Sequence, residues 1–172
     1  MYELKSISPE AIPAALERAE RYRLLNQPRP AESICLDILR IDPQNQQALV
    51  VLLLSLTDQF GRPGCEVTIQ NALEILPRLS GAYERAYYDG VISERWGKAL
   101  LSGKAPARAA LDWIRQAMVL FEKAESIAPA GNDEAILRWN ACARLIMRIE
   151  KDSPAADEAD PDAGFSEDAP LR

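Results

Sequence analysis

The sequence offers few side chains with which to carry out catalytic chemistry. It contains no histidine in 172 residues, so imidazole bases, His-activated nucleophiles and the commonest metal ligand are all missing. The run from Gly61 to Gly64 lacks the length and the Lys-Ser/Thr pair of a phosphate-binding loop. Carboxylates such as Glu17, four residues before Arg21, fall into ordinary helix-surface pairings. We therefore expect a protein that is not an enzyme and that needs no cofactor and no metal.

The three cysteines and the N-terminal residues favour a reducing compartment. None of the cysteines forms a C-x-x-C pair, and a helical core uses Cys as a small hydrophobic residue. The first five residues lack the basic and then apolar pattern of a secretory signal. The longest apolar run, Ala48–Leu54, is far shorter than the roughly 20 residues of a membrane span. We expect a cytoplasmic protein with no membrane contact.

Charge divides the chain into two parts. Residues 1–151 hold 19 Lys/Arg and 19 Asp/Glu, so the net charge of −6 lies on residues 152–172, which hold seven acids and Arg172. A neutral body has no overall field to attract nucleic acid, and we expect none as a partner. The acidic segment has few apolar residues, with Phe165 its one aromatic, and its composition predicts disorder. It could serve as a solubilising segment or as an arm that binds a basic partner.

A pattern of small, apolar and proline residues occurs three times with the same internal spacing of 4, 3 and 5 residues. The first two copies lie 34 residues apart, and the third follows 52 residues after the second. The copies are Ala31, Cys35, Ile38, Pro43; Cys65, Ile69, Ala72, Pro77; and Ala117, Phe121, Ala124, Pro129. A fixed period of this length predicts stacked supersecondary units. The extra 18 residues predict an enlarged third unit.

Capping residues and apolar periodicity predict about seven helices and no strand. The first helix should begin after Pro13 and end near Leu25, and the seventh should be followed by the acidic tail. The other expected ranges are 30–40, 45–58, 65–76, 81–101, 106–127 and 132–151. The fourth range has the weakest helix propensity, because Val67, Thr68 and Ile69 are β-branched. The domains should be a helical repeat domain at 1–151 and a tail at 152–172.

The repeated pattern resembles that of the tetratricopeptide repeat (TPR) family over about residues 12–129. The second-helix pattern is present in all three units, whereas the first-helix pattern is partial: unit one keeps Tyr22, and unit three has Tyr83, Tyr87 and Gly90. The resemblance implies an all-α, right-handed superhelical stack of antiparallel helix pairs, with the seventh helix as its cap. It also implies a scaffold that binds a peptide or a partner protein on a concave face lined by the first helix of each unit.

Projecting that face onto this sequence selects residues from the first, third and fifth helices. They are Leu16, Glu20, Arg23, Val50, Leu54, Thr57, Glu84, Tyr88, Val91 and Arg95. The last four follow the spacing i, i+4, i+7, i+11 of one helix face. Val50 and Leu54 could instead pack inside a tight stack. The Lys and Asn with which some family members hold a C-terminal carboxylate are replaced here by Leu16 and Glu20.

The seventh helix is apolar over a wider arc than one neighbouring helix would cover. Its polar residues Asn140, Arg144, Arg148 and Lys151 fill about 80° of the helical wheel. We expect a homodimer interface there, formed by Ile136, Trp139, Ile146 and Ile149. The alternative is that the two long preceding helices bury this face.

Two glycines and three tyrosines suggest further roles. Gly90 and Gly97 lie on one face of a long helix, where they could allow close approach of another helix or a ligand. Tyr83, Tyr87 and Tyr88 would line the pocket if the chain were a peptide or small-molecule sensor. A structural subunit whose face is filled by its own packing is the remaining alternative to a scaffold.

Overall fold

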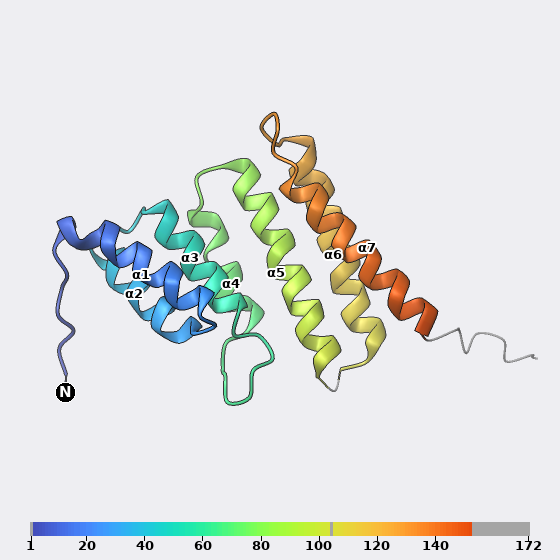
Figure 1. The fold of residues 1–172 in the computed structure, drawn as a ribbon, viewed down its shortest axis with the longest axis horizontal. Coiled ribbons are helices and arrows are strands. Elements are labelled where there is room, and N and C mark those ends of the chain that lie inside the picture. Colours follow the sequence, from blue (N-terminus) through green and yellow to red (C-terminus); the bar gives the residue numbers. More distant parts are fainter. Residues whose placement is uncertain (1, 104, 153–172) are drawn as a thin grey trace, which may run out of the picture.

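The computed structural model describes residues 2–103 and 105–152, and these residues form α-helices and short 3-10 helices without a strand (Figure 1). The elements are η1 (Pro9–Ala11), α1 (Ile12–Leu24), α2 (Pro28–Ile41), α3 (Gln46–Thr57), α4 (Ile69–Leu73), η2 (Leu76–Arg78), α5 (Ala82–Ser102), α6 (Ala107–Ser126) and α7 (Glu134–Asp152). The all-α prediction with about seven helices is confirmed for this part of the chain. The predicted disordered tail and Phe165 lie outside the described residues.

The helices α1, α2 and α3 begin within about two residues of the predicted starts, but α1 begins at Ile12, before Pro13 and not after it. Pro13 stands in the first turn of α1, and Pro28 begins α2 two residues earlier than expected. Both positions tolerate proline, because the first amides of a helix have no intrahelical partner. Asn45 caps α3, and its side-chain oxygen accepts a hydrogen bond from the Ala48 amide at 3.0 Å. The sequence therefore fixes these starts locally.

The fourth helix is much shorter than the predicted range 65–76. It occupies Ile69–Leu73 and is followed by the 3-10 turn η2. Gly61 and Gly64 have φ of 71° and 69°, values that a helix cannot contain, but both lie before the predicted range and leave residues 65–68 unexplained. The helix starts only after Thr68, whose backbone N–H donates to the Asn71 side chain at 2.9 Å. The spacing of the repeat is kept, but its second copy loses the first part of its helix.

Successive helices pack against one another along the long axis of the molecule, from α1 and α2 at one end to α6 and α7 at the other (Figure 1). Contacts also join α1 to α3 and α3 to α5. The small and apolar residues of the repeat serve this packing: Ala31, Cys35, Ala117 and Phe121 are all fully buried. The first and third copies of the pattern thus mark helix contacts, whereas Cys65 of the second copy lies in the loop before α4 and is half-buried.

The two longest helices, α5 and α6, lie very close together because of the two glycines. A Cβ atom added to Gly90 would lie 2.6 Å from the ring of Phe121, and one added to Gly97 would lie 2.9 Å from the Ala110 carbonyl oxygen. Real Cβ atoms do not approach neighbours this closely. Close helix packing, one of the two roles expected for these glycines, is confirmed.

The core consists of two clusters that meet at α5. The first lies among α1, α2, α3 and α4 and includes Leu49, Leu53 and, from α5, Ile92. The second lies among α5, α6 and α7 and includes Ile114 and, from α5, Val91. No helix within residues 2–103 and 105–152 is long and apolar enough to cross a membrane.

Candidate functional site

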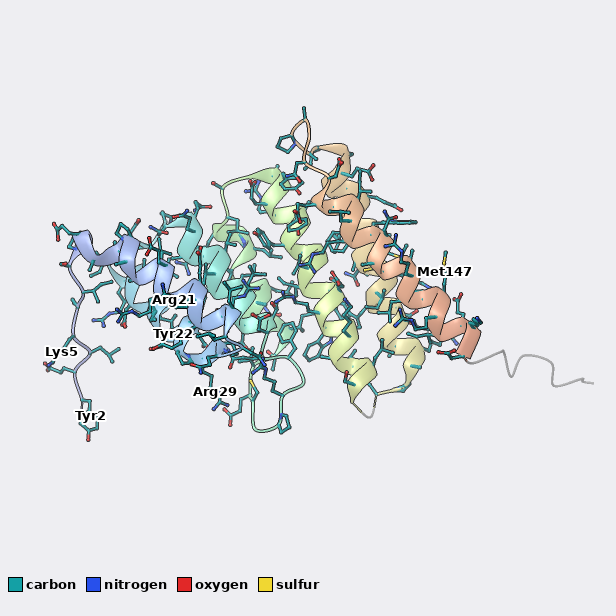
Figure 2. The ribbon with its side chains drawn as sticks, in the orientation of Figure 1. Tyr2, Lys5, Arg21, Tyr22, Arg29 and Met147 are labelled. Atoms are coloured by element: carbon teal, nitrogen blue, oxygen red, sulfur yellow. The ribbon has the colours of Figure 1, made fainter. Side chains whose placement is uncertain are left out.

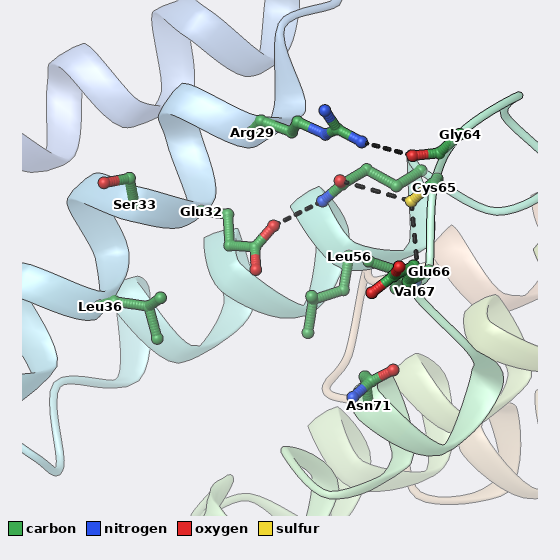
Figure 3. A pocket seen from close by; sticks show the side chains of 11 residues that line it. Arg29, Glu32, Ser33, Leu36, Leu56, Gly64, Cys65, Glu66, Val67 and Asn71 are labelled. Carbon is green, nitrogen blue, oxygen red and sulfur yellow. Dashed lines mark hydrogen bonds between the residues drawn. The ribbon is translucent and has the colours of Figure 1, made fainter.

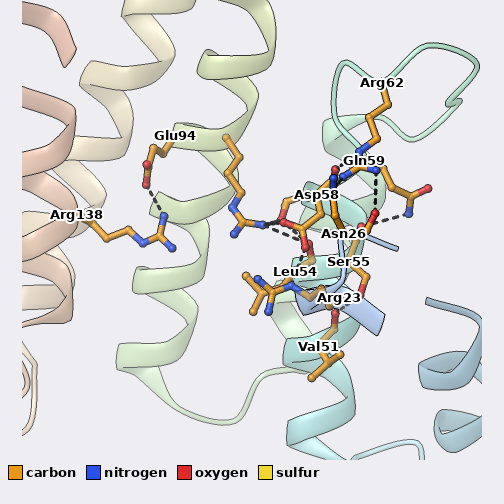
Figure 4. A network of polar contacts seen from close by, with 12 residues as sticks. Arg23, Asn26, Val51, Leu54, Ser55, Asp58, Gln59, Arg62, Glu94 and Arg138 are labelled. Carbon is orange, nitrogen blue, oxygen red and sulfur yellow. Dashed lines mark hydrogen bonds and ion pairs between the residues drawn. The ribbon is translucent and has the colours of Figure 1, made fainter. Parts of the chain in front are cut away.

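A row of charged side chains crosses the helices α1, α3, α5 and α7 (Figure 4). At its centre, Asp58 follows the last residue of α3 and accepts hydrogen bonds from two arginines. Arg23 of α1 donates its Nε–H to Asp58 Oδ2 at 2.7 Å, and Arg95 of α5 donates from Nη1 to Asp58 Oδ1 at 2.5 Å. One carboxylate therefore joins three helices that are distant in sequence.

The end of α3 also supplies neutral acceptors for Arg95. The same Nη1 group lies 2.7 Å from Thr57 Oγ1 and 3.3 Å from the Leu54 carbonyl oxygen. The Leu54 carbonyl also accepts a hydrogen bond from the Asp58 backbone N–H at 2.9 Å, and the partial negative charge at the end of a helix suits a guanidinium. Arg95 is thus held by the end of a helix as well as by a carboxylate.

The row continues on the other side of α5 through Glu94. This carboxylate is 2% exposed and lies between two cations: Lys98 Nζ is 2.5 Å from Oε1, and Arg138 Nη1 of α7 is 2.8 Å from Oε2. Arg138 also donates its Nε–H to the Tyr87 hydroxyl at 3.3 Å, and its guanidinium carbon lies 6.0 Å from the centre of that ring. A buried carboxylate needs such partners, because an unpaired one would be strongly destabilising.

We call Arg23, Asp58, Arg95, Glu94 and Arg138 the arginine row. Its three guanidinium groups are between 20% and 29% exposed, and its two carboxylates leave one of their positive charges unbalanced. Burial lowers the pKa of Arg95, Asp58 raises it, and the positive charges of Arg138 and Arg23 lower it again. Burial also lowers the pKa of Arg138, but Glu94 outweighs that effect and raises it overall. Both arginines stay charged at neutral pH.

Three tyrosines of α5 lie beside the row. The rings of Tyr83 and Tyr87 are stacked with centres 5.7 Å apart, and Tyr88 meets Tyr87 edge-on at 5.1 Å. Burial raises the pKa of Tyr83 and that of Tyr88, so both hydroxyl groups remain neutral. The three rings pack against the second core cluster. The three rings contact one another and lie along one side of the row, where Tyr87 accepts the hydrogen bond from Arg138.

The structure brings together part of the partner-facing surface predicted from the sequence. Arg23, Thr57 and Arg95 meet around Asp58, with the Leu54 backbone among them. Glu20 and Glu84 are exposed on α1 and α5, and Val50, Leu54 and Tyr88 are half-buried against the core.

Three of the predicted surface residues are buried, which corrects the prediction for them. Val91 is 0% exposed in the second core cluster, Leu16 is 8% exposed in the first, and Thr57 is 3% exposed. Val91 follows Tyr88 by three residues, which turns it about 60° around the helix, toward α6. These side chains position the face but offer little area to a partner.

Sequence reasoning missed Asp58, Glu94 and Arg138, which complete the row. Asp58 stood at the expected end of the third helix, and Glu94 stands four residues before Lys98, a spacing typical of a helix-surface ion pair. Nothing in the sequence places Arg138 beside Glu94, because that contact depends on how α7 packs.

The predicted oligomer interface on α7 is partly used inside the chain. Trp139 donates its indole N–H to Glu122 of α6 at 2.9 Å, and Trp139 and Ile146 pack on the second core cluster. Ile136 and Ile149 are half-buried. Leu137 and Met147 are instead the most exposed apolar residues of α7, at 62% and 68%, and Met147 projects away from the neighbouring helices (Figure 2).

A separate hollow of about 760 Å³ lies between α2, the end of α3 and the loop before α4 (Figure 3). Its polar groups bond to one another: Arg29 donates to the Gly64 carbonyl at 2.8 Å, and Gln59 donates to Glu32 at 2.6 Å. Cys65 on its wall is half-buried. Among the described residues, no three His, Cys, Asp or Glu side chains form a group that could hold a metal ion.

No protein-family model matches this chain, and no curated protein and no solved structure is significantly similar to it. The resemblance to the TPR family therefore stays a prediction from the repeated pattern. The class of protein that the fold defines is an all-α array of packed helices with a charged row across its odd-numbered helices.

Proposed function

We propose that this chain is a non-enzymatic interaction scaffold that binds a peptide or a segment of a partner protein on the face formed by α1, α3, α5 and α7. In this proposal the helix pairs follow the superhelical, TPR-like arrangement that the 34-residue spacing predicts. The order of helix packing and the contacts of α1 with α3 and α3 with α5 support it. The three free cysteines, two of them buried, support the reducing, cytoplasmic environment expected from the sequence.

The arginine row carries the proposal. It gathers three guanidinium groups from α1, α5 and α7, which are far apart in sequence. A guanidinium can bind carboxylate or backbone oxygen with two parallel hydrogen bonds, and partial burial strengthens such bonds. Because the donors are fixed by Asp58 and Glu94, little side-chain entropy would be lost when a ligand binds.

Selection of peptides from a random display library against the full chain tests this function. We expect the selected peptides to lose at least about tenfold in affinity for Arg23→Gln or Arg95→Gln, since each loses a charge-assisted hydrogen-bond donor. Arg144→Gln, an exposed cation of α7 outside the row, is the matched control and should bind them as the wild type does. If the selected peptides bind both row variants as tightly as the wild type, or if the selection yields no peptide, the row is excluded as a binding site.

A second candidate function, a structural subunit that forms homodimers through α7, is favoured by the exposure of Leu137 and Met147. Ile136 and Ile149 would lie at the border of such an interface. Light scattering of the full chain over a range of concentrations tests this candidate. A monomer at high micromolar concentration rules it out.

A further inference from the structure

The arginine row has more donors and more positive charge than the described residues satisfy. Its three arginines face two carboxylates, which leaves an excess of one positive charge, and Lys98 beside Glu94 is matched by Glu134 beside Tyr87. Within residues 2–103 and 105–152, both Nη groups of Arg23, Nε and Nη2 of Arg95 and Nη2 of Arg138 have no hydrogen-bond acceptor. Partly buried donors in this state favour an anionic ligand.

The same chain contains a segment of complementary charge. Residues 153–172 hold six acidic side chains and one basic one, Arg172. Phe165 stands among these acids, between Asp162 and Glu167. The row has the matching composition, because Tyr87 and Tyr88 lie beside its arginines. A carboxylate can bind a guanidinium while a neighbouring aromatic ring packs on tyrosine.

We propose that residues 153–172 bind the arginine row of their own chain and compete there with a partner. This inference rests on the proposed function of the row as a binding site. The carboxylates of the segment occupy the open donors of Arg23, Arg95 and Arg138, and Phe165 packs beside the tyrosines. The segment then acts as an internal competitor that a partner must displace.

The segment is long enough to reach the row. Arg138 stands 14 residues before Asp152 in α7. At a rise of 1.5 Å per residue, these two residues are about 21 Å apart along the helix axis. An extended chain spans up to about 3.3–3.6 Å per residue, so ten residues beyond Asp152, at Asp162, reach about 33–36 Å. Glu94, the direct partner of Arg138, adjoins Arg95 in the sequence, so the centre of the row lies within the same range.

Other cations lie nearer to the segment but fit it less well. Arg144, Arg148 and Lys151 of α7 are exposed. Ion pairs between exposed side chains contribute little, since water solvates both partners. Glu134 accepts a hydrogen bond from the Tyr87 hydroxyl at 3.4 Å, beside Arg138, and Glu84 is exposed on α5, so repulsion disfavours the acidic segment over Tyr83 and Tyr87 and favours its contact with Arg23 and Arg95.

Nuclear magnetic resonance of the full chain tests the proposal. The comparison variant, in which the six acids of residues 153–172 become amides, changes nothing in the helical body. We expect the backbone and Nε–H signals of Arg95 and Arg138 to differ between the two proteins near 50 mM salt and to converge near 500 mM. The signals of Arg144 and Arg148 are the matched control and should not differ. Differences confined to α7 after Leu145 would overturn the proposal, and differences that grow with protein concentration would assign the contact to a second copy.

A synthetic peptide of residues 153–172, added to both proteins, separates this inference from the proposed function. If the tethered segment occupies the row, the peptide should bind the amide variant at least about tenfold more tightly than the wild type, because a tether supplies a millimolar effective concentration. Arg95→Gln in the amide variant should abolish that binding. If the peptide binds the row of both proteins with equal affinity, the proposal of an internal competitor is wrong, but the row remains a binding site. Absence of peptide binding would overturn this inference too, and the library selection would then decide the proposed function by itself.

Discussion

Replacing Gly97 by alanine tests the tight packing of α5 against α6. The new Cβ would lie 2.7 Å from Ile114 Cδ1 and 2.9 Å from the Ala110 carbonyl oxygen. The isoleucine methyl can rotate, but the carbonyl belongs to the backbone of α6 and cannot move alone. The two helices must therefore separate by roughly half an ångström to restore an ordinary contact, which loosens the core around Phe121.

Two opposing effects set the size of the change in stability. Alanine is about 1 kcal/mol more favourable than glycine in a helix interior, and overpacking costs about 1–3 kcal/mol. Because the clash involves backbone, we expect a cost near the upper end and a net loss of about 1–2 kcal/mol. At a glycine without crowding, the same substitution would raise the stability. The direction of the change in stability therefore shows whether overpacking or helix propensity dominates at Gly97.

Urea unfolding followed by circular dichroism measures this change. Ala141→Gly, at an exposed position of α7, is the control that measures the alanine–glycine difference in this protein and should cost about 1 kcal/mol. Ile114→Val removes the Cδ1 atom, so it should cost less in the Gly97→Ala background than in the wild type, with a coupling of at least about 0.5 kcal/mol. A Gly97→Ala protein more stable than the wild type would refute the reasoning.

Three further predictions concern charge and thiol chemistry. Asp58→Ala removes the carboxylate that both arginines share; with these side chains 20% to 24% exposed, we expect a loss of about 1–2 kcal/mol in urea unfolding, smaller in concentrated salt. Burial raises the pKa of Asp89, so wild-type stability should fall as pH rises through that folded-state value. Asp89→Asn should therefore raise the melting temperature near pH 7, and a gain that persists below about pH 3.9, the ordinary value, would contradict this cause. Burial raises the pKa of Cys35 and that of Cys142 to about 12. A disulfide reagent near pH 8 should thus modify only Cys65 rapidly in the folded protein, and rapid modification of two thiols would contradict the burial.

The sequence predicts most of the helices because their starts and contacts depend on neighbouring residues. Prolines in first turns, the Asn45 cap and the small residues of the repeat are local features with local effects. The length of α4 was wrong because the repeat spacing predicts where a helix contacts its neighbour but not where it starts. Residues 65–68 stay outside the helix, and Thr68 has the extended backbone of a cap before the first helical residue, Ile69.

The candidate site was predictable only in part, for a different reason. Arg23 and Arg95 followed from helix register, yet their shared partner Asp58 depends on the turn that ends α3, and Arg138 depends on the docking of α7. Val91 was misplaced because the spacing rule assumes that a helix has one free face. The prediction for Val91 therefore failed where tertiary packing surrounds a helix.

The packing around α5 also explains why the row sits where it does. This helix contacts α3, α4 and α6 and bonds to α7, and it contributes to both core clusters, so Ser93 and Glu94 are buried at 1% and 2% exposure. A helix fixed from several sides cannot rotate to adapt to a ligand. Arg95 and the groups held by Glu94 are therefore set in position before binding, and a ligand gains affinity by fitting them rather than by moving them. Because packing fixes that geometry, a change at Gly97, on the side of α5 opposite Arg95, should also weaken binding at the row although it removes no charge.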